Sequence, residues 1–261
     1  NGALAHDIAF GDLLENGGTF AGRMIDGAPG EGARLSHAAV DGETFGHHRR
    51  FGEMALAYCL ETVEGGGEAE LTVYGEFLEK HPPTAAVEIA ENTSWSCTHG
   101  VERWRSDCGC RAGDHPEWRQ AWRKPLRDSL DRLREEVDRL FEEAGGEYFG
   151  DPWEARDGYI DSLLGGGRPE GRAEDLLEME RFAMLMYTSC GWFFDDISRI
   201  ETVQVLGYAA RAAQLAGAIS GRDLLGPFLK SLEEVPGNTE EVPNARRALE
   251  AAFGERLGIA G

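Results

Sequence analysis

Apolar residues recur at three- and four-residue steps through most of the second half of the chain. The longest series runs over Trp118, Trp122, Leu126, Leu130, Leu133, Val137 and Leu140. This spacing places apolar side chains on one face of an amphipathic helix, which Pro125 is expected to kink or divide. Shorter series of the same kind cover roughly 153–164, 173–189, 198–217, 221–231 and 240–256. The second half is therefore predicted to form a helical bundle.

The first half mixes helical patterns with two short apolar runs. Helical spacing covers residues 2–16, 50–61 and 70–80. The runs Leu35–Val40 and Ala85–Ala90 are short enough for buried strands, and each passes directly into a polar loop. Loops at the carboxyl ends of parallel strands commonly carry chemistry. We therefore predict a mostly α fold with a small α/β part, consisting of a βα-barrel-like region over 1–112 and a helical domain over 113–261.

The first polar cluster follows the run 35–40 and contains two carboxylates, two imidazoles and two glycines. It reads Asp41-Gly42-Glu43-Thr44-Phe45-Gly46-His47-His48. Glycines let the backbone turn sharply and let a bulky substrate come close. A carboxylic acid that is partly desolvated at a strand end can act as a general acid near neutral pH, which makes Asp41 the candidate. The same residues also fit a turn in which Asp41 caps the next helix.

Two further segments combine aromatic and polar residues. In the loop from Glu91 to Trp104, tryptophan faces could stack on sugar rings while Asn, Arg and carboxylate groups bind hydroxyls. Alternatively, its tryptophans complete a core. In the segment 189–198, Trp192 could stack on a sugar and Asp195 or Asp196 could bind its hydroxyls. Alternatively, the aromatic residues are core and the two aspartates begin a helix, where the dipole favours them.

Three thiols and one imidazole lie within 14 residues, as Cys97-x-His99 and Cys108-x-Cys110. Such a set could hold a structural zinc ion. Its one-residue spacings are tighter than the usual two to four, so free thiols or a single disulfide, without metal, are the favoured interpretation.

The composition narrows the classes of partner and compartment. The formal net charge of −21 argues against nucleic acid and anionic membranes, because phosphate groups would be repelled. No apolar run approaches the roughly 18 residues of a membrane helix, and we expect no secretory leader. Five cysteines, an odd number, argue against a full disulfide framework and favour a reducing cytoplasm. No cofactor is expected.

These motifs resemble those of glycoside hydrolase family 57, which includes α-amylases, amylopullulanases, 4-α-glucanotransferases and branching enzymes. The segment Asp41–Gly46 resembles the acid/base motif of that family, and Gly191–Phe194 with Asp195 and Asp196 is similar to its aromatic-acidic motif. The stretches 34–60, 87–110 and 181–216 are similar to a bacterial and archaeal subset in which a helical domain of unknown function follows the barrel.

The resemblance implies a retaining hydrolase or transglycosidase that acts on α-1,4- or α-1,6-glucan, with Asp41 as the acid/base. The family's nucleophile is a Glu on an earlier barrel strand, so we expect this chain to be a C-terminal portion that lacks it. The residues expected to contact the sugar are His47, Trp95, His99, Arg103, Trp104, Trp192 and Asp195. The alternative is a non-catalytic module that binds carbohydrate or a protein partner, with or without a stabilising zinc ion.

Overall fold

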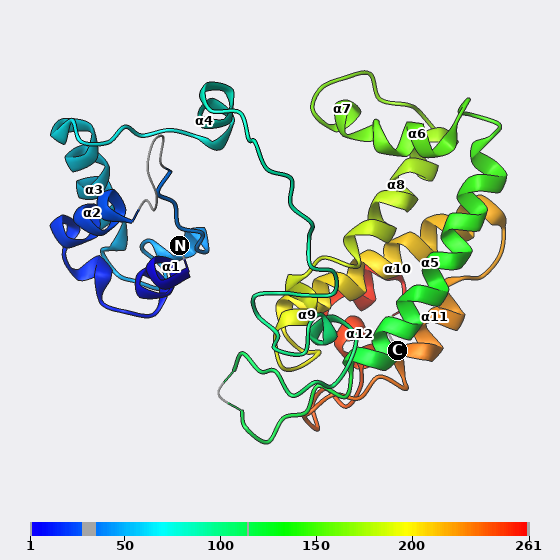
Figure 1. Ribbon diagram of the computed structural model, residues 1–261. Helices are drawn as coiled ribbons and strands as arrows, with labels where there is room; N and C mark the ends of the chain where they lie inside the picture. Colours follow the sequence, from blue (N-terminus) through cyan, green and yellow to red (C-terminus); the bar gives the residue numbers. More distant parts are fainter. Residues whose placement is uncertain (1, 28–34, 114, 260–261) are drawn as a thin grey trace. The chain divides into compact units, whose positions relative to one another are not determined.

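The computed structural model describes residues 2–27, 35–113 and 115–259. They belong to two compact units, Asn1–Ile89 and Ala90–Gly261, which divide the chain 23 residues before the boundary expected from the sequence at 112/113 (Figure 1). Residues 90–112 therefore belong to the helical second unit.

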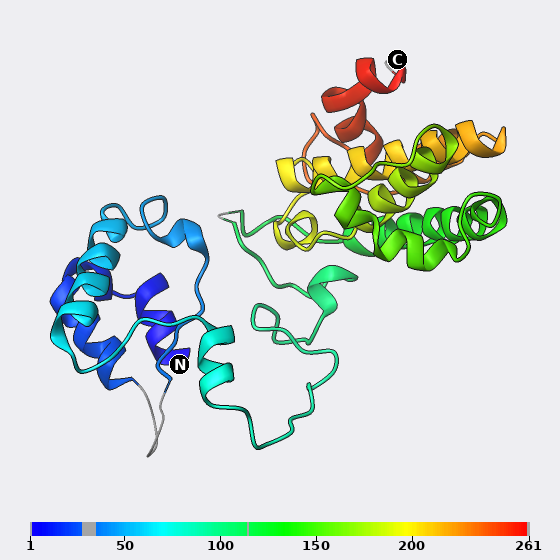
Figure 2. The same cartoon turned by 90° about the horizontal axis from the view of Figure 1, so that it is seen from above.

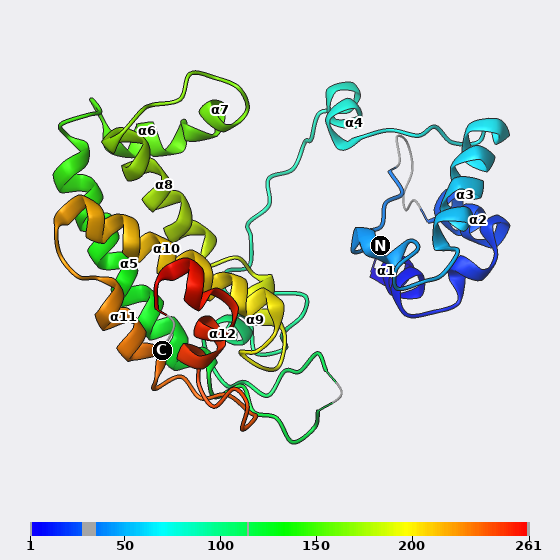
Figure 3. The same ribbon diagram turned by 180° about the vertical axis from the view of Figure 1, so that it is seen from behind.

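The second unit is a bundle of helices around α10 (Ile200–Ser220). Its long neighbours are α5 (Arg123–Gly145), α8 (Arg172–Leu185), α11 (Leu225–Leu232) and α12 (Ala245–Leu257), which all contact α10 (Figure 3). The short helices are α6 (Pro152–Asp157), α7 (Tyr159–Leu163) and α9 (Cys190–Phe193). This arrangement confirms the helical second half that the apolar spacing predicts.

Small side chains make α10 the central helix of the bundle. The alanines Ala209, Ala210, Ala212, Ala213 and Ala216 are all fully buried. A helix that is apolar on all sides belongs inside a bundle, where small residues let neighbouring backbones come close. On α9, Gly191 serves the same purpose, because a Cβ there would lie 2.3 Å from Val205 Cγ2. Although α10 has 21 residues, neither it nor any other described helix is long and apolar enough to cross a membrane.

The amphipathic helix predicted between residues 118 and 140 is α5, which begins later than its apolar pattern. Its buried face extends from Leu126 to Phe141. Pro125 lies in the first turn, where the missing backbone N–H has no partner to lose, so it marks the helix start instead of dividing the helix. Trp118 and Trp122 precede the helix and belong to the loop before it.

The first unit is small and helical. It consists of α1 (Gly2–Ala9), η1 (Leu13–Glu15), α2 (Gly17–Asp26), η2 (Gly42–Thr44), α3 (Gly52–Gly66) and α4 (Tyr74–Lys80). The core holds Leu4, Ile8, Leu13, Phe20, Ala21, Cys59 and Val63. The sequence did not predict α2, because Asn16 followed by two glycines is typical of a helix end. Asn16 begins a helix instead, since its side chain accepts a hydrogen bond from Thr19 N at 2.8 Å.

The prediction of a βα-barrel portion is wrong. Across residues 2–27, 35–113 and 115–259 there is no β-strand or sheet, and the β-type pairs are isolated bridges such as Phe45–Arg49. The runs 35–40 and 85–90 are non-helical, but neither pairs with a second strand, which a strand needs to satisfy its backbone hydrogen bonds. In the second run Val87 and Ile89 are 89% and 84% exposed, so their apolar character does not place them in a core.

A carboxyl group is buried inside the bundle on α8. Glu180 is fully buried, and neither carboxylate oxygen has a hydrogen-bond partner in the described part of the chain. Arg134 Nη2 lies 3.8 Å from Glu180 Oε2, too far for a hydrogen bond, and Arg134 also pairs with Asp138. Burial raises the pKa of Glu180 to about 7; Asp138 adds to this effect, whereas Arg134 opposes it. The folded chain therefore holds this proton more tightly than the unfolded chain does.

We predict that Glu180→Gln stabilises the protein above pH 7 and changes little near pH 4.5. An acid whose pKa is raised on folding costs stability as the pH rises from its unfolded value towards about 7, whereas glutamine has no proton to lose. The expected gain above pH 7 is roughly 1–3 kcal/mol in the free energy of unfolding. Urea denaturation across this pH range measures it, with the exposed Glu135→Gln on α5 as the control. A wild-type pH dependence in Glu180→Gln would contradict the prediction.

Candidate metal centre

The second unit begins with a long segment that has little regular structure. Leaving aside position 114, residues 90–122 contain one 3-10 turn, η3 (Glu102–Trp104), and otherwise turns and bends (Figure 2). Loops longer than about 12–15 residues without secondary structure of their own are uncommon in compact domains. Side-chain interactions must therefore hold this segment in place.

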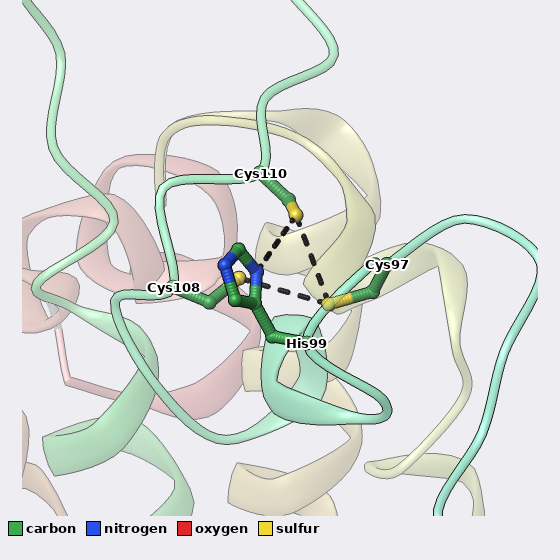
Figure 4. A group of neighbouring side chains, drawn as sticks. All are labelled: Cys97, His99, Cys108 and Cys110. Carbon is green, nitrogen blue, oxygen red and sulfur yellow. Dashed lines mark hydrogen bonds between the residues drawn. The ribbon is translucent and has the colours of Figure 1, made fainter.

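Four side chains of this segment converge on one point (Figure 4). Cys97 and His99 come from the turns before η3, and Cys108 and Cys110 come from the extended chain after it. Their ligand atoms all lie within 4.8 Å of one another. Cys97 is buried, Cys108 and Cys110 are half-buried, and His99 is exposed. The 3-10 turn reverses the chain and so brings the two pairs together.

Three distances within this cluster are close to those of a tetrahedral zinc site. Cys97 Sγ lies 3.9 Å from Cys108 Sγ and 3.7 Å from Cys110 Sγ, and Cys110 Sγ lies 3.5 Å from His99 Nδ1. Tetrahedral zinc bonds imply separations of about 3.8 Å between two sulfurs and about 3.6 Å between sulfur and nitrogen. A disulfide requires about 2.05 Å between the sulfurs, and the cysteines are free. The side chains present therefore fit zinc better than a disulfide.

The environment of Cys97 favours a thiolate, which is the form that binds metal. Burial on its own would raise the pKa of this thiol. The backbone N–H groups of Arg103 and His99 and the neighbouring thiols of Cys110 and Cys108 outweigh burial and lower the pKa to about 7. Burial raises the pKa of the Cys108 thiol, which lies beside the thiols of Cys97 and Cys110.

Two buried arginines adjoin the thiol cluster. Arg123 is fully buried and Arg103 is 4% exposed. Arg123 donates to the carbonyl oxygens of Phe193, Phe194 and Cys110, and its Nη1 lies 4.0 Å from Cys108 Sγ. Arg103 donates to Phe193 O at 2.9 Å, with its guanidinium 4.2 Å from the centre of the Phe193 ring.

Neither guanidinium forms a direct ion pair with a carboxylate among the described residues, although the nearby Asp195 carboxylate favours the charged form of Arg123. Burial of an unpaired charge is costly. Three thiolates around one divalent zinc ion carry a net charge of −1, which a guanidinium beside the cluster offsets. Metal-bound thiolates would therefore add to the negative charge that Asp195 already places near Arg123.

The sugar-contact residues predicted in the second unit lie close to the segment 189–195 but differ in exposure. Trp95 is 83% exposed, with its ring centre 6.4 Å from that of Phe193. Trp104 is half-buried and donates its ring N–H to Ser189 O. Trp192 lies in the core and stacks on Trp122 with 6.1 Å between ring centres. His99 belongs to the thiol cluster, Arg103 binds the Phe193 carbonyl, and Asp195 is buried.

Asp41 and His47 belong to the first unit. Asp41 is exposed at the start of η2, and its side chain makes no capping hydrogen bond there. His47 is also exposed, with its ring centre 5.0 Å from that of His48. Glu43, on the same turn, lies 3.5 Å from His48 Nε2. The turn thus presents acidic and imidazole groups to solvent.

Sequence reasoning missed Arg123, although the sequence carries a signal for it. Arg123 precedes Leu126 by three residues and Leu130 by seven, which places it on the apolar face of α5. A charged residue at an apolar-face position is unusual and indicates a buried polar partner. Here the partners are the carbonyl groups and thiols of the preceding loop and of the Phe193–Phe194 segment.

Comparison with known proteins finds one relationship. The domain of unknown function DUF3536, which occurs in proteins associated with glycoside hydrolase family 57, matches residues 118–173 and 167–253, together just over half of the chain. No curated protein and no solved structure matches. The matched region includes Arg123 and the bundle helices but begins after the thiol cluster. The chain therefore belongs to the DUF3536 family.

Proposed function

We propose that the second unit is a zinc-stabilised helical domain that serves a family-57-type protein acting on α-glucan. The observation that carries the zinc assignment is the convergence of Cys97, His99, Cys108 and Cys110 within 4.8 Å. The two buried arginines beside the cluster support it independently, because they need negative charge nearby.

The proposed zinc site is structural. Four protein ligands close a tetrahedral site, whereas a catalytic zinc keeps one position open for water or substrate. Bound zinc would fix both ends of the chain reversal around η3 and so hold residues 97–110 against the bundle. Through Arg123, which reaches Cys108 on one side and Phe193 and Phe194 on the other, the metal would also fix the segment that follows α9.

We predict one equivalent of tightly bound zinc per chain, lost in Cys110→Ser. A serine hydroxyl is a poor zinc ligand, so the affinity should fall at least about 100-fold. Atomic emission of the purified protein gives the stoichiometry, and competition with a chromogenic chelator gives the affinity. The matched control is Cys190→Ser, since Cys190 is an exposed free cysteine outside the cluster. Absence of zinc in the wild-type protein, or its retention in Cys110→Ser, would refute the site.

A second prediction concerns the neighbouring arginine. Arg123→Lys keeps the charge but removes the planar fork that binds several carbonyl oxygens at once. Groups that orient metal ligands typically contribute 10–100-fold to affinity, so zinc binding should weaken by about 10-fold or more. The exposed Arg105→Lys is the control, because Arg105 lies outside the thiol cluster and pairs with Glu102 in the same loop. Equal zinc affinity in both variants would show that Arg123 does not support the site.

The second candidate function is catalysis on α-glucan, with Asp41 as acid/base. One observation favours it: DUF3536 occurs in proteins associated with family 57. The Asp41-Gly42-Glu43 turn itself is exposed and follows no strand within residues 35–113, so the partial desolvation expected at Asp41 is not found there. Asp41 would protonate the glycosidic oxygen of the leaving group and then take a proton from water or from an acceptor hydroxyl. A retaining mechanism also needs a nucleophilic carboxylate roughly 5–5.5 Å away. We assign that role to a residue outside this chain.

We predict that Asp41→Asn in the full-length protein lowers hydrolysis or transfer on maltooligosaccharides by about 10²–10⁴-fold, because the amide cannot exchange the proton. Glu64→Gln, an exposed change on α3, is the control. Product release measured by chromatography distinguishes the outcomes. Unchanged activity in Asp41→Asn would exclude its acid/base role. Glucan binding without turnover in the intact protein would favour the non-catalytic carbohydrate-binding module.

A further inference from the structure

A small cavity lies beside the metal centre in the second unit. Its volume is about 240 Å³, and it is lined by Ala112, Gly113, His115 and Trp118 from one chain segment and by Phe194, Asp195 and Arg199 from another. The first segment follows directly after Cys110, and the second follows α9. Neither the zinc ligands nor Asp41 lines this cavity.

Two stacked aromatic rings line the cavity, and His115 covers one face of Trp118. The rings of His115 and Trp118 stack with 3.9 Å between their centres and 13° between their planes. Trp118 is half-buried, so its ring is held by the protein while part of it stays accessible. The π face of an indole ring carries partial negative charge and attracts weakly positive C–H groups. One face of a pyranose ring presents such C–H groups.

The second segment presents an unsatisfied carboxylate. Asp195 Oδ1 accepts a hydrogen bond from Ala112 N at 2.9 Å, whereas Asp195 Oδ2 is buried without a partner in the described ranges. The Asp195 backbone is fixed, because its carbonyl oxygen accepts from Trp122 Nε1 at 3.1 Å. A buried acceptor left without a donor is unfavourable, so a donor from a ligand would stabilise the site.

Gly113 packs closely against this oxygen. A Cβ built on Gly113 would lie 2.8 Å from Asp195 Oδ2, closer than side-chain carbons normally approach. Any larger residue at position 113 would therefore press on the carboxylate. The glycine thus lets the backbone lie against a buried acceptor that no donor of the described residues uses.

The cavity combines a carboxylate, a guanidinium and aromatic rings, and this combination favours a neutral ligand over an anion or a cation. Arg199 is exposed at the rim, with its guanidinium 5.5 Å from the centre of the Phe194 ring, and supplies donors opposite the carboxylate acceptor. An anion would meet the buried Asp195 and the negative net charge of the chain. A cation would meet Arg199. A neutral ring with many hydroxyls satisfies both the acceptor and the donors and stacks on the aromatic rings.

We propose that this cavity binds one neutral pyranose unit, with the ring on the His115–Trp118 surface and a hydroxyl donating to Asp195 Oδ2. The inference rests on the proposed α-glucan function only for the choice of glucose as that unit. The residues that line the cavity belong to the second unit, whereas Asp41 belongs to the first.

The test is titration of the zinc-loaded chain with maltose, and with methyl mannoside and methyl galactoside, followed by saturation-transfer NMR and tryptophan fluorescence. Binding is expected for at least one of these sugars. Trp118→Ala, which removes the larger aromatic ring, and Gly113→Ala, whose Cβ would press on the Asp195 carboxylate, should each weaken it about 10-fold or more. Asp195→Asn preserves the shape and should weaken it similarly. Tyr148→Ala, an exposed aromatic change outside the cavity, should bind like wild type.

Circular dichroism and zinc content establish that each variant is folded. Should one variant not fold, the other two still test the cavity. No binding of any of the three sugars, or binding that all three cavity variants retain, would overturn the proposal. Binding of mannoside or galactoside without maltose supports the cavity and excludes glucose as its pyranose unit. Loss of catalysis in Asp41→Asn with sugar binding intact separates this subsite from the catalytic turn.

Discussion

The second unit depends on two buried positive charges, those of Arg103 and Arg123. Both guanidiniums donate to Phe193 O, and Arg123 also reaches Phe194 O, Cys110 O and the Cys108 sulfur. Burial of guanidinium groups is unfavourable unless negative charge and hydrogen-bond acceptors surround them, and Asp195 supplies part of that charge for Arg123. Carbonyl groups supply the acceptors, and thiolates bound to zinc would supply further negative charge. Zinc-bound thiolates would therefore offset the charge of the buried arginines, and the arginines would stabilise the anionic metal ligands.

This arrangement links three features that are distant in the sequence. The thiol-bearing loop, the segment after α9 and the start of α5 all meet at Arg123. The segment after α9 carries Asp195, whose carboxylate lines the cavity and binds the backbone just beyond Cys110. A change at the metal centre would therefore reach the proposed sugar subsite through one side chain and a short stretch of backbone. The segment after α9 would thus take part in both functions: its backbone carbonyl groups bind Arg123 beside the metal centre, and the Asp195 carboxylate lines the proposed sugar subsite.

The sequence predicts the helical bundle well, because apolar residues at three- and four-residue steps leave little choice of buried face in α5. It fails where a local pattern has two meanings. Asn16 and the glycines after it fit a helix end, yet Asn16 caps α2. The apolar runs at 35–40 and 85–90 fit strands, but a strand needs a neighbour that a local pattern cannot supply. The ligand set was visible as Cys and His residues, whereas their convergence depends on the chain reversal at η3.

X-ray absorption at the zinc edge of the purified protein tests the metal centre most directly. The ligands Cys97, His99, Cys108 and Cys110 predict a first coordination sphere of three sulfurs at about 2.3 Å and one nitrogen at about 2.0 Å. A spectrum with only nitrogen and oxygen neighbours, or a protein that carries no zinc after purification without chelator, would contradict this structure of the site.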